Sequence, residues 1–342
     1  MDAMSKSYKR TSRREVLNRT AVGLGGISIV GLAGCLGDDN GASDVTLATS
    51  FEEGHVLVDA AEEFADQVED ETDGAISIEI TPGGAYGAED EIAEQVQDGV
   101  IEMHSGGGMP YSMFAPEYYF FDNPFVVEDL DHLRQIEDSE QFGTGQEMLA
   151  EEGNQRHIGS FIYRGLRQFT SNEPIREPAD LDGIDLRLPE LDPWVSIWEE
   201  VGASATAVAL DELYSGLEQG VADASEGDAE QISSFNLHEV QDYLSLTEHQ
   251  VQAGGLYVNE DFFQGLDEAD QDAVLEAAEA ASMTASQQSE DEEQDIIEEL
   301  EAEGMEIIDD VDQGAFLDQA EPAVNELFES EWEGTWDEWR EV

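Results

Sequence analysis

The chain has 342 residues, of which 40% are hydrophobic, enough for about two domains with buried cores. Its 13 basic residues face 82 acidic ones, which gives a formal net charge of −69. This balance makes nucleic acid an implausible partner, because phosphate binding requires a basic patch that the chain lacks.

The first 34 residues are typical of an export leader rather than of a folded domain. Ser12-Arg13-Arg14-Glu15-Val16-Leu17 resembles a twin-arginine signal, and the apolar run at 21–33 is too short to span a bilayer as a mature helix. Leu32-Ala33-Gly34-Cys35 is similar to a lipobox, so we expect 35–43 to be a lipidated cysteine and tether on the outer face of the cytoplasmic membrane. The alternative is a cleaved signal with a chance cysteine. Because Cys35 is the only cysteine, disulfides are excluded.

The following segment alternates strands with helices. We predict strands at 45–49, 75–80 and 100–104, separated by amphipathic helices at 56–68 and 89–96. This alternation predicts a parallel α/β layer, whose third strand leads into the run Gly106-Gly107-Gly108. A helical region at 128–153 follows, and two strands, at 156–163 and 167–171, are expected to cross into a second lobe.

The C-terminal third is predicted to return to the first lobe through strands at 243–246 and 255–259. An Ala- and Glu-rich helix at 266–300 suits a brace across the back of two lobes, although a coiled-coil dimer arm stays open. A strand at 305–308 and a helix at 313–328 complete the pattern. Trp332, Trp336 and Trp339 are expected to pack the tail against the rest of the protein.

The stretch from Pro178 to Asp228 carries the strongest functional pattern. A glycine turn feeds a short strand that ends on Arg187, and helices at 194–201 and 211–219 alternate with strands at 203–208 and 221–225. In such β-α-β-α-β units ligands bind outside the carboxyl ends of the strands, which is where Arg187 falls. After Cys35 the chain has seven arginines and no lysine. The planar guanidinium can hold a carboxylate through two parallel hydrogen bonds, so Arg187 is the first candidate for anion binding.

Three motifs of this stretch resemble, in order, the solute-binding receptors of TRAP (tripartite ATP-independent periplasmic) transporters. They are Asp180 to Pro189, Val201 to Ser204 and Asp211 to Asp223, and the similarity extends over 45–328. The resemblance implies a two-lobed, periplasmic-binding-protein-like α/β fold with a hinge, a cleft between the lobes and a long C-terminal brace helix. Lobe one would comprise 44–167 and 244–310 and lobe two 168–243, with 311–342 forming C-terminal helices that pack on the lobes.

In that family the arginine at the position of Arg187 clamps the carboxylate of an organic acid, such as a dicarboxylate, another carboxylate or a sugar acid. The resemblance thus implies a receptor that passes such an anion to the membrane permease subunits of a TRAP transporter. Arg167 occupies the family's Gly-x-Arg-Gln position and would hold the ligand together with Arg187. A structural ion pair is the alternative for Arg167, because acidic residues are so abundant.

The chain departs from the family where many relatives carry Gln-Glu-Asn-Pro and it has Ser225-Glu226-Gly227-Asp228. The amide expected to hydrogen-bond the ligand is therefore missing, and Asp228 or Gln231 would have to replace it. The remaining ligand-binding candidates are Glu226, Gly227, the backbone amide of Gly107, Trp194, Trp198 and, as an acceptor of sugar hydroxyls, Glu190. For each of the two tryptophans, a place in the hydrophobic core is the alternative.

Catalytic chemistry finds no support in the sequence. The six histidines lack the spacing of a zinc site, and no nucleophile elbow or phosphate-binding loop is present. We therefore expect no catalytic residue, no metal and no cofactor. The rival interpretations are the substrate-binding protein of an ABC importer, which shares this architecture, and an extracellular hydrolase, which would need a nucleophile or metal set.

The charge balance generates a first prediction. At molar salt the Debye length is about 3 Å and the acidic residues are screened from one another, whereas at tens of millimolar salt it exceeds about 10 Å. Removing salt should therefore lower the melting temperature of the protein, measured by circular dichroism across a salt series. A melting temperature that does not change with salt would contradict the inference that the protein is built for brine.

Overall fold

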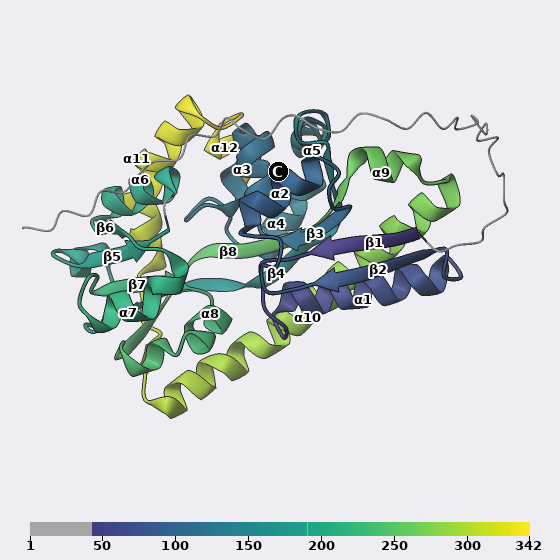
Figure 1. Cartoon of the computed structure of the whole chain (residues 1–342). Helices are drawn as coiled ribbons and strands as arrows, with labels where there is room; N and C mark the ends of the chain where they lie inside the picture. Colours follow the sequence, from purple (N-terminus) through teal and green to yellow (C-terminus); the bar gives the residue numbers. More distant parts are fainter. Residues whose placement is uncertain (1–42, 190) are drawn as a thin grey trace, which may run out of the picture. The chain divides into compact units, whose positions relative to one another are not determined.

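A computed structural model describes residues 43–189 and 191–342 of the chain (Figure 1). The predicted export leader and Cys35 lie outside the described residues, as does nearly all of the tether predicted at 35–43. No helix among the described residues is long and apolar enough to cross a membrane.

Nine strands of the described residues form one mixed sheet in the order β2-β1-β3-β8-β4-β7-β5-β6, with β9 paired to β8. β1 pairs in parallel with β2 and β3, and β5 pairs in parallel with β6 and β7, so both predicted parallel units are confirmed. The strands are β1 (Ser43–Ala48), β2 (Ile76–Thr81), β3 (Met103–Gly106), β4 (Gln155–Ser171), β5 (Asp185–Leu188), β6 (Ser204–Ala207), β7 (Ala224–Gly227), β8 (Tyr243–Asn259) and β9 (Glu306–Ile308).

The antiparallel pair of β4 and β8 joins the two parallel units. Each strand is 17 residues long, where the sequence had predicted two short strands in each place. β3 pairs with β8 at Gly255 to Val258, and β7 pairs with β4 at Gln168 to Ser171. Because β4 and β8 run in opposite directions, these two pairings lie at opposite ends of the ribbon, and the parallel units are held apart by it (Figure 1).

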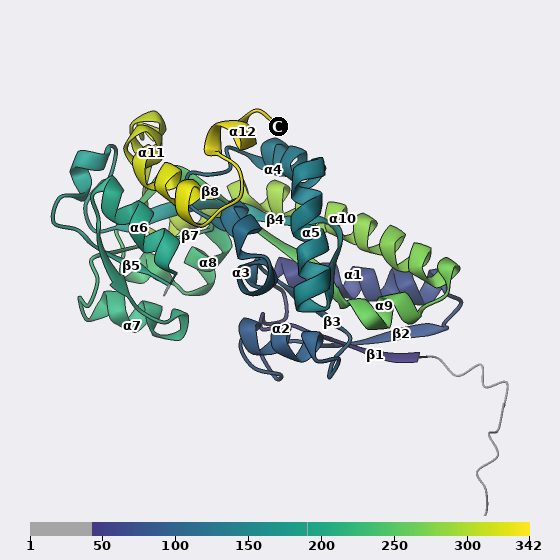
Figure 2. The same cartoon turned by 90° about the horizontal axis from the view of Figure 1, so that it is seen from above.

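Twelve α-helices of the described residues cover this sheet. α1 and α10 lie on one side of β1 and β2 in Figure 1, with α2 to α5 on the other, and Figure 2 shows the same elements from above. The helices are α1 (Val56–Glu71), α2 (Glu89–Gln97), α3 (Met109–Phe114), α4 (Leu130–Glu137), α5 (Glu140–Gly153), α6 (Asp192–Val201), α7 (Leu213–Glu218), α8 (Ala229–Ser234), α9 (Glu260–Gly265), α10 (Glu268–Glu303), α11 (Gln313–Ser330) and α12 (Trp336–Arg340).

Two features of the helical segment between β3 and β4 were not predicted correctly. The helical region expected at 128–153 is interrupted, because the Ser139 side chain accepts a hydrogen bond from the Phe142 backbone and begins α5 as a new helix. The segment before it forms α3 and the 3₁₀-helix η1 (Pro116–Asp122), for which no element was predicted. Helices this short carry too little periodicity to be recognised in a sequence.

α10 is one continuous helix of 36 residues, as predicted. Its first turns bury alanines, including Ala278, against α1 and β4, and its last turns bury Ile297 and Leu300 in a separate core with α7 and α8. Between these faces Glu293 accepts hydrogen bonds from the Leu166 backbone and from the Tyr163 hydroxyl, both at 2.8 Å. Between its two buried faces α10 thus contacts the middle of β4 through the Glu293 carboxylate.

The largest core is rich in aromatic side chains from η1, α5, α6 and the C-terminal helices. Trp332, Trp336 and Trp339 are all buried in it, and the Trp339 ring lies 4.5 Å from that of Phe120. The prediction that these tryptophans pack the tail against the protein is confirmed.

The contact between α10 and β4 leads to a prediction about Gly159. This glycine has a φ of +68°, and a Cβ atom there would lie 2.6 Å from the Ala278 carbonyl oxygen. Gly159→Ala should therefore combine backbone strain with a clash and lower the free energy of unfolding by about 2–5 kcal/mol. Urea denaturation in molar salt measures this change.

Gly183→Ala is the matched control. Gly183 also has a positive φ, of +88°, but its Cβ would meet nothing within 4 Å. Only the strain of about 1–2 kcal/mol is expected there. Equal losses for the two variants would mean that the approach of α10 to β4 is not a constraint.

Candidate functional site

A cavity of about 180 Å³ lies beside the ends of several strands. Gly107 and Gly108 follow β3, Arg187 belongs to β5, and Arg164 and Arg167 come from β4. The carboxyl ends of β3 and β5 meet here, as the rule for parallel strands predicts. The lining also includes Glu89, Met109, Tyr119, Asp122, Pro189, Leu191, Trp194, Leu210, Gln231 and Gln252.

Arg187 is buried, with 3% of its surface exposed, and is held from one side only. Its Nε donates to the Val208 carbonyl oxygen at 2.9 Å, and no carboxylate among the described residues forms an ion pair with it. Burial lowers the pKa of Arg187, an effect that Glu226 opposes and Arg167 reinforces, but a guanidinium remains charged at any physiological pH. The two terminal nitrogens are thus available for a carboxylate, in a place where a desolvated cation lacks a counter-ion.

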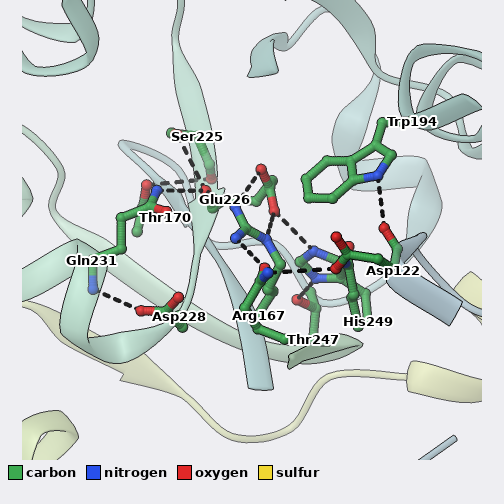
Figure 3. A network of polar contacts seen from close by, with 12 residues as sticks. Asp122, Arg167, Thr170, Trp194, Ser225, Glu226, Asp228, Gln231, Thr247 and His249 are labelled. Carbon is green, nitrogen blue, oxygen red and sulfur yellow. Dashed lines mark hydrogen bonds and ion pairs between the residues drawn. The ribbon is translucent and has the colours of Figure 1, made fainter. Parts of the chain in front are cut away.

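Arg167 lies beside Arg187 but is already engaged. Its Nε and Nη2 donate to the two carboxylate oxygens of Glu226, and Nη2 also donates to the Glu226 carbonyl oxygen at 3.1 Å (Figure 3). Its Nη1 donates to Gln252 Oε1 at 2.6 Å. A guanidinium has five N–H groups, so Arg167 keeps only one for a ligand. The alternative interpretation of Arg167, a structural ion pair, therefore describes most of its hydrogen bonds.

Glu226 lies behind Arg167 and is fully buried. Burial disfavours its anion, but Arg167 and the hydrogen bond from His249 hold the pKa of Glu226 at about 2. Burial also lowers the pKa of His249, whose Nε2 lies 3.3 Å from Glu226 and whose Nδ1 lies 2.8 Å from the Thr247 hydroxyl. A neutral His249 must then donate from Nε2 to the carboxylate and accept at Nδ1 from Thr247. Glu226 thus orients Arg167, and it does not itself line the cavity.

The two predicted tryptophans have different places. Trp194 lines the cavity: its indole nitrogen donates to the Asp122 carbonyl oxygen at 3.1 Å, and the Arg167 guanidinium lies 5.0 Å from its ring centre. Trp198 has no exposed surface and packs in the core against Phe125 and His249. The core alternative thus describes Trp198, whereas Trp194 forms a wall of the cavity.

Several of the remaining candidate residues make other contacts than those predicted for them. The backbone amide of Gly107, predicted as a ligand donor, donates to the Glu89 carboxylate instead. Gly227 does not line the cavity, whereas Gln231, one of the two predicted replacements for the missing amide, does. The other, Asp228, caps α8 through the Gln231 backbone and lies 3.7 Å from Arg164. Glu190 lies outside the described residues.

Sequence reasoning missed the acidic part of the lining, Asp122 and Glu89. Burial raises the pKa of Glu89, and it raises the pKa of Asp122 to about 7 against the opposing influence of Arg164 and Arg167. Asp122 lies at the end of a run of aromatic residues that reads as core, and Glu89 is one of many acids at the start of a helix. The only available signal was that Asp122 interrupts an otherwise apolar stretch.

The contacts of Arg167 predict a large effect on stability. Arg167→Ala would leave Glu226 buried without its counter-ion, which should cost about 3–5 kcal/mol of unfolding free energy. The double variant Arg167→Met/Glu226→Leu removes both charges and should recover most of this loss. Urea denaturation in molar salt compares the three proteins, and a single variant as stable as the wild type would show that the pair is not structural.

Comparison with known proteins places this geometry in a family. Residues 47–331 match the family described as bacterial extracellular solute-binding protein, family 7. A solute-binding protein from Roseobacter denitrificans is 33% identical over 222 residues, which are 65% of this chain and 68% of that protein. The 2,3-diketo-L-gulonate-binding periplasmic protein of Escherichia coli is 28% identical over 79% of this chain and 82% of its own.

The solved structures agree in fold. A TRAP periplasmic solute-binding protein from Roseobacter denitrificans with bound L-galactonate is 31% identical, covers 83% of this chain and 93% of its own, and superposes with a TM-score of 0.74. One from Bordetella, 27% identical, covers 87% of this chain and 98% of its own with a TM-score of 0.78. The predicted mixed α/β fold is thereby confirmed, and the chain belongs to the bacterial extracellular solute-binding proteins of family 7, which are transport receptors and not enzymes.

Proposed function

We propose that this receptor captures a small organic acid anion outside the cytoplasmic membrane and delivers it to the membrane subunits of a TRAP transporter. The observation that carries the proposal is the state of Arg187, which is buried in a cavity with its terminal nitrogens free of any carboxylate among the described residues. A carboxylate of the ligand would complete the pair that the protein leaves open there. The solved relatives are TRAP receptors, which favours a TRAP permease over an ABC importer as the partner.

A sugar acid is the ligand class that the surroundings of Arg187 favour. Gln231 and Gln252 line the cavity and present amides that can exchange hydrogen bonds with hydroxyl groups. The related receptor from Roseobacter denitrificans holds L-galactonate, and the relative from Escherichia coli is named for 2,3-diketo-L-gulonate. A dicarboxylate or another carboxylate is the alternative within the same mechanism.

Closure around the ligand would use the ribbon of β4 and β8. Residues on both sides of the proposed lobe boundaries, 44–167 with 244–310 against 168–243, line the cavity. The ribbon carries register shifts between Ile158 and Ile162, between Tyr163 and Leu166, and between Arg167 and Phe169, where regular pairing is broken. Strands are easier to bend at such irregularities, so a hinge within this stretch is part of the proposal.

The ligand is found by a thermal-shift screen of monocarboxylates, dicarboxylates and sugar acids in molar salt. With the acid so identified, Arg187→Ala should weaken binding by roughly 30-fold to a few thousand-fold, since a buried anion left unpaired costs about 2–5 kcal/mol. Arg187→Lys should also bind poorly, because a point charge cannot supply two parallel hydrogen bonds. Titration calorimetry measures both affinities.

Arg340→Ala is the control for charge alone. Arg340 pairs with Glu128 at the surface of the tail, and its loss should leave the affinity within about twofold. If the Arg187 and Arg340 variants bind equally well, the carboxylate clamp and most of the case for an organic-acid receptor are lost.

We also propose that the leader exports this receptor and anchors it to the membrane. A twin-arginine signal would export the folded protein, and a lipid on Cys35 would hold it at the outer face of the membrane within reach of the permease. The excess of acidic residues would keep it soluble in brine. The supporting observations are the motifs at 12–17 and 32–35 and the net charge of −69.

The anchor has its own test. A Cys35→Ser variant lacks the thiol that would carry the lipid, so it should move from the membrane fraction to the medium. Wild type and variant are compared by cell fractionation and immunoblotting. If both partition alike, the lipobox is a coincidence of sequence.

A further inference from the structure

Asp122 is a buried carboxyl group that faces the anion cavity without an ion pair of its own among the described residues. Its Oδ1 accepts hydrogen bonds from Gln250 at 3.1 Å and from Gln252 at 3.4 Å, and its Oδ2 has only a long contact with the Tyr119 hydroxyl, at 3.4 Å. The neighbouring cations pair elsewhere, Arg167 with Glu226 and Arg164 with Asp228. A carboxylate in this position is stabilised by the charges of Arg164 and Arg167, without an ion pair to either, and by the two glutamine amides.

An anion bound to Arg187 would enter the same cavity of about 180 Å³ as this carboxyl group. Two carboxylates that share a small buried space cannot both stay ionised without a large electrostatic cost, and one of them then holds a proton. The ligand is fixed as the anion by the Arg187 guanidinium. The proton must therefore go to the protein.

We propose that capture of the organic anion at Arg187 is coupled to the uptake of one proton from solvent by Asp122. The proton binds Oδ2, because Oδ1 already accepts two N–H groups, and the neutral carboxyl can then donate a hydrogen bond to the ligand. The receptor in this state carries the anion and a proton together. This inference rests on the proposed function and adds to it a residue and a stoichiometry.

The electrostatics of the cavity are consistent with such a step. Burial raises the pKa of Asp122 to about 7, while Arg164 and Arg167 oppose this rise. A bound anion offsets the field of these arginines and displaces water, and both effects raise the pKa of Asp122 further. At pH 8 the free receptor would thus have Asp122 largely ionised, and the complex would have it protonated.

Other titratable groups face the same space and define the alternatives. Glu89 also has a pKa raised by burial, but its Oε1 accepts the Gly107 amide, which favours the ionised form. His249 is engaged on both ring nitrogens. The charged or titratable groups that line the cavity with Asp122 are Glu89 from α2, Tyr119 from η1, Arg164 and Arg167 from β4 and Arg187 from β5. Glu226 from β7 and His249 from β8 lie behind Arg167.

Titration calorimetry at pH 8 in phosphate and in Tris measures the proton directly, because the two buffers release very different heats on ionisation. The probe is the acid with the largest thermal shift in the screen, with sodium D-glucuronate tested first. Wild type should take up roughly half to one proton per ligand, and its affinity should fall by up to about tenfold per pH unit above pH 8. Asp122→Asn, which mimics the neutral carboxyl, should take up none and bind with an affinity independent of pH.

The control is Glu137→Gln. Burial also raises the pKa of Glu137 to about 7, but Glu137 lies outside the cavity, where it pairs with Arg134. This variant should keep the proton uptake of the wild type. In Glu89→Gln the proton should still go to Asp122, although loss of the neighbouring carboxylate lowers the pKa of Asp122.

Three results would overturn the inference: a wild type that binds without proton uptake, loss of uptake in Glu89→Gln while Asp122 is intact, or uptake that persists in Asp122→Asn. If Asp122→Asn does not fold, the wild-type and Glu89→Gln measurements still decide. Failure of every acid to bind the wild type would contradict the proposed function instead.

Discussion

The buried pair of Arg167 and Glu226 determines what Arg187, a neighbouring arginine of the cavity, can do. It joins β4 to β7 across the sheet, and His249 from β8 completes it, so three strands are held in register by one charged cluster. The pair uses all but two of the N–H groups of Arg167, and Gln252 takes one more. No carboxylate among the described residues pairs with Arg187, so its two terminal nitrogens stay free beside a neighbour whose charge is compensated. The site therefore offers one strong position for a carboxylate rather than the two that a pair of arginines suggests.

The fold was predictable wherever the pattern is local. Strand-type and helix-type hydrophobic patterns alternate visibly along the sequence. They predict the parallel units around β1 and β5 and the long helix α10. The continuity of β4 was not predictable, because Gly165, which has a positive φ inside the strand, falls in the gap between the two predicted strands. What keeps the strand together is remote: Glu293 of α10, 127 residues away from Leu166, bonds to the irregular stretch. No window of sequence contains that contact.

The candidate site, like the fold, was predictable only where the signal is local. The position of Arg187 was predictable, since a short strand in a parallel unit delivers its last residues to the ligand side of the sheet. The occupation of Arg167 was not, because it depends on Glu226 and Gln252, which follow it by 59 and 85 residues in the chain. Asp122 escaped notice because an acid after four aromatic residues looks like the edge of a core. Residue type and local spacing identify candidates, but the number of free hydrogen bonds on each comes only from the packed structure.

The central claim is that Arg187 binds the ligand carboxylate while Arg167 stays paired with Glu226. A crystal structure of the protein with its acid bound tests it most directly. The account predicts a ligand carboxylate whose two oxygens lie within about 3 Å of the two terminal nitrogens of Arg187. It also predicts that Arg167 still pairs with Glu226 in the complex and gives the ligand no more than one hydrogen bond. A ligand carboxylate held by two bonds to Arg167, with Glu226 displaced and Arg187 unoccupied, would contradict it.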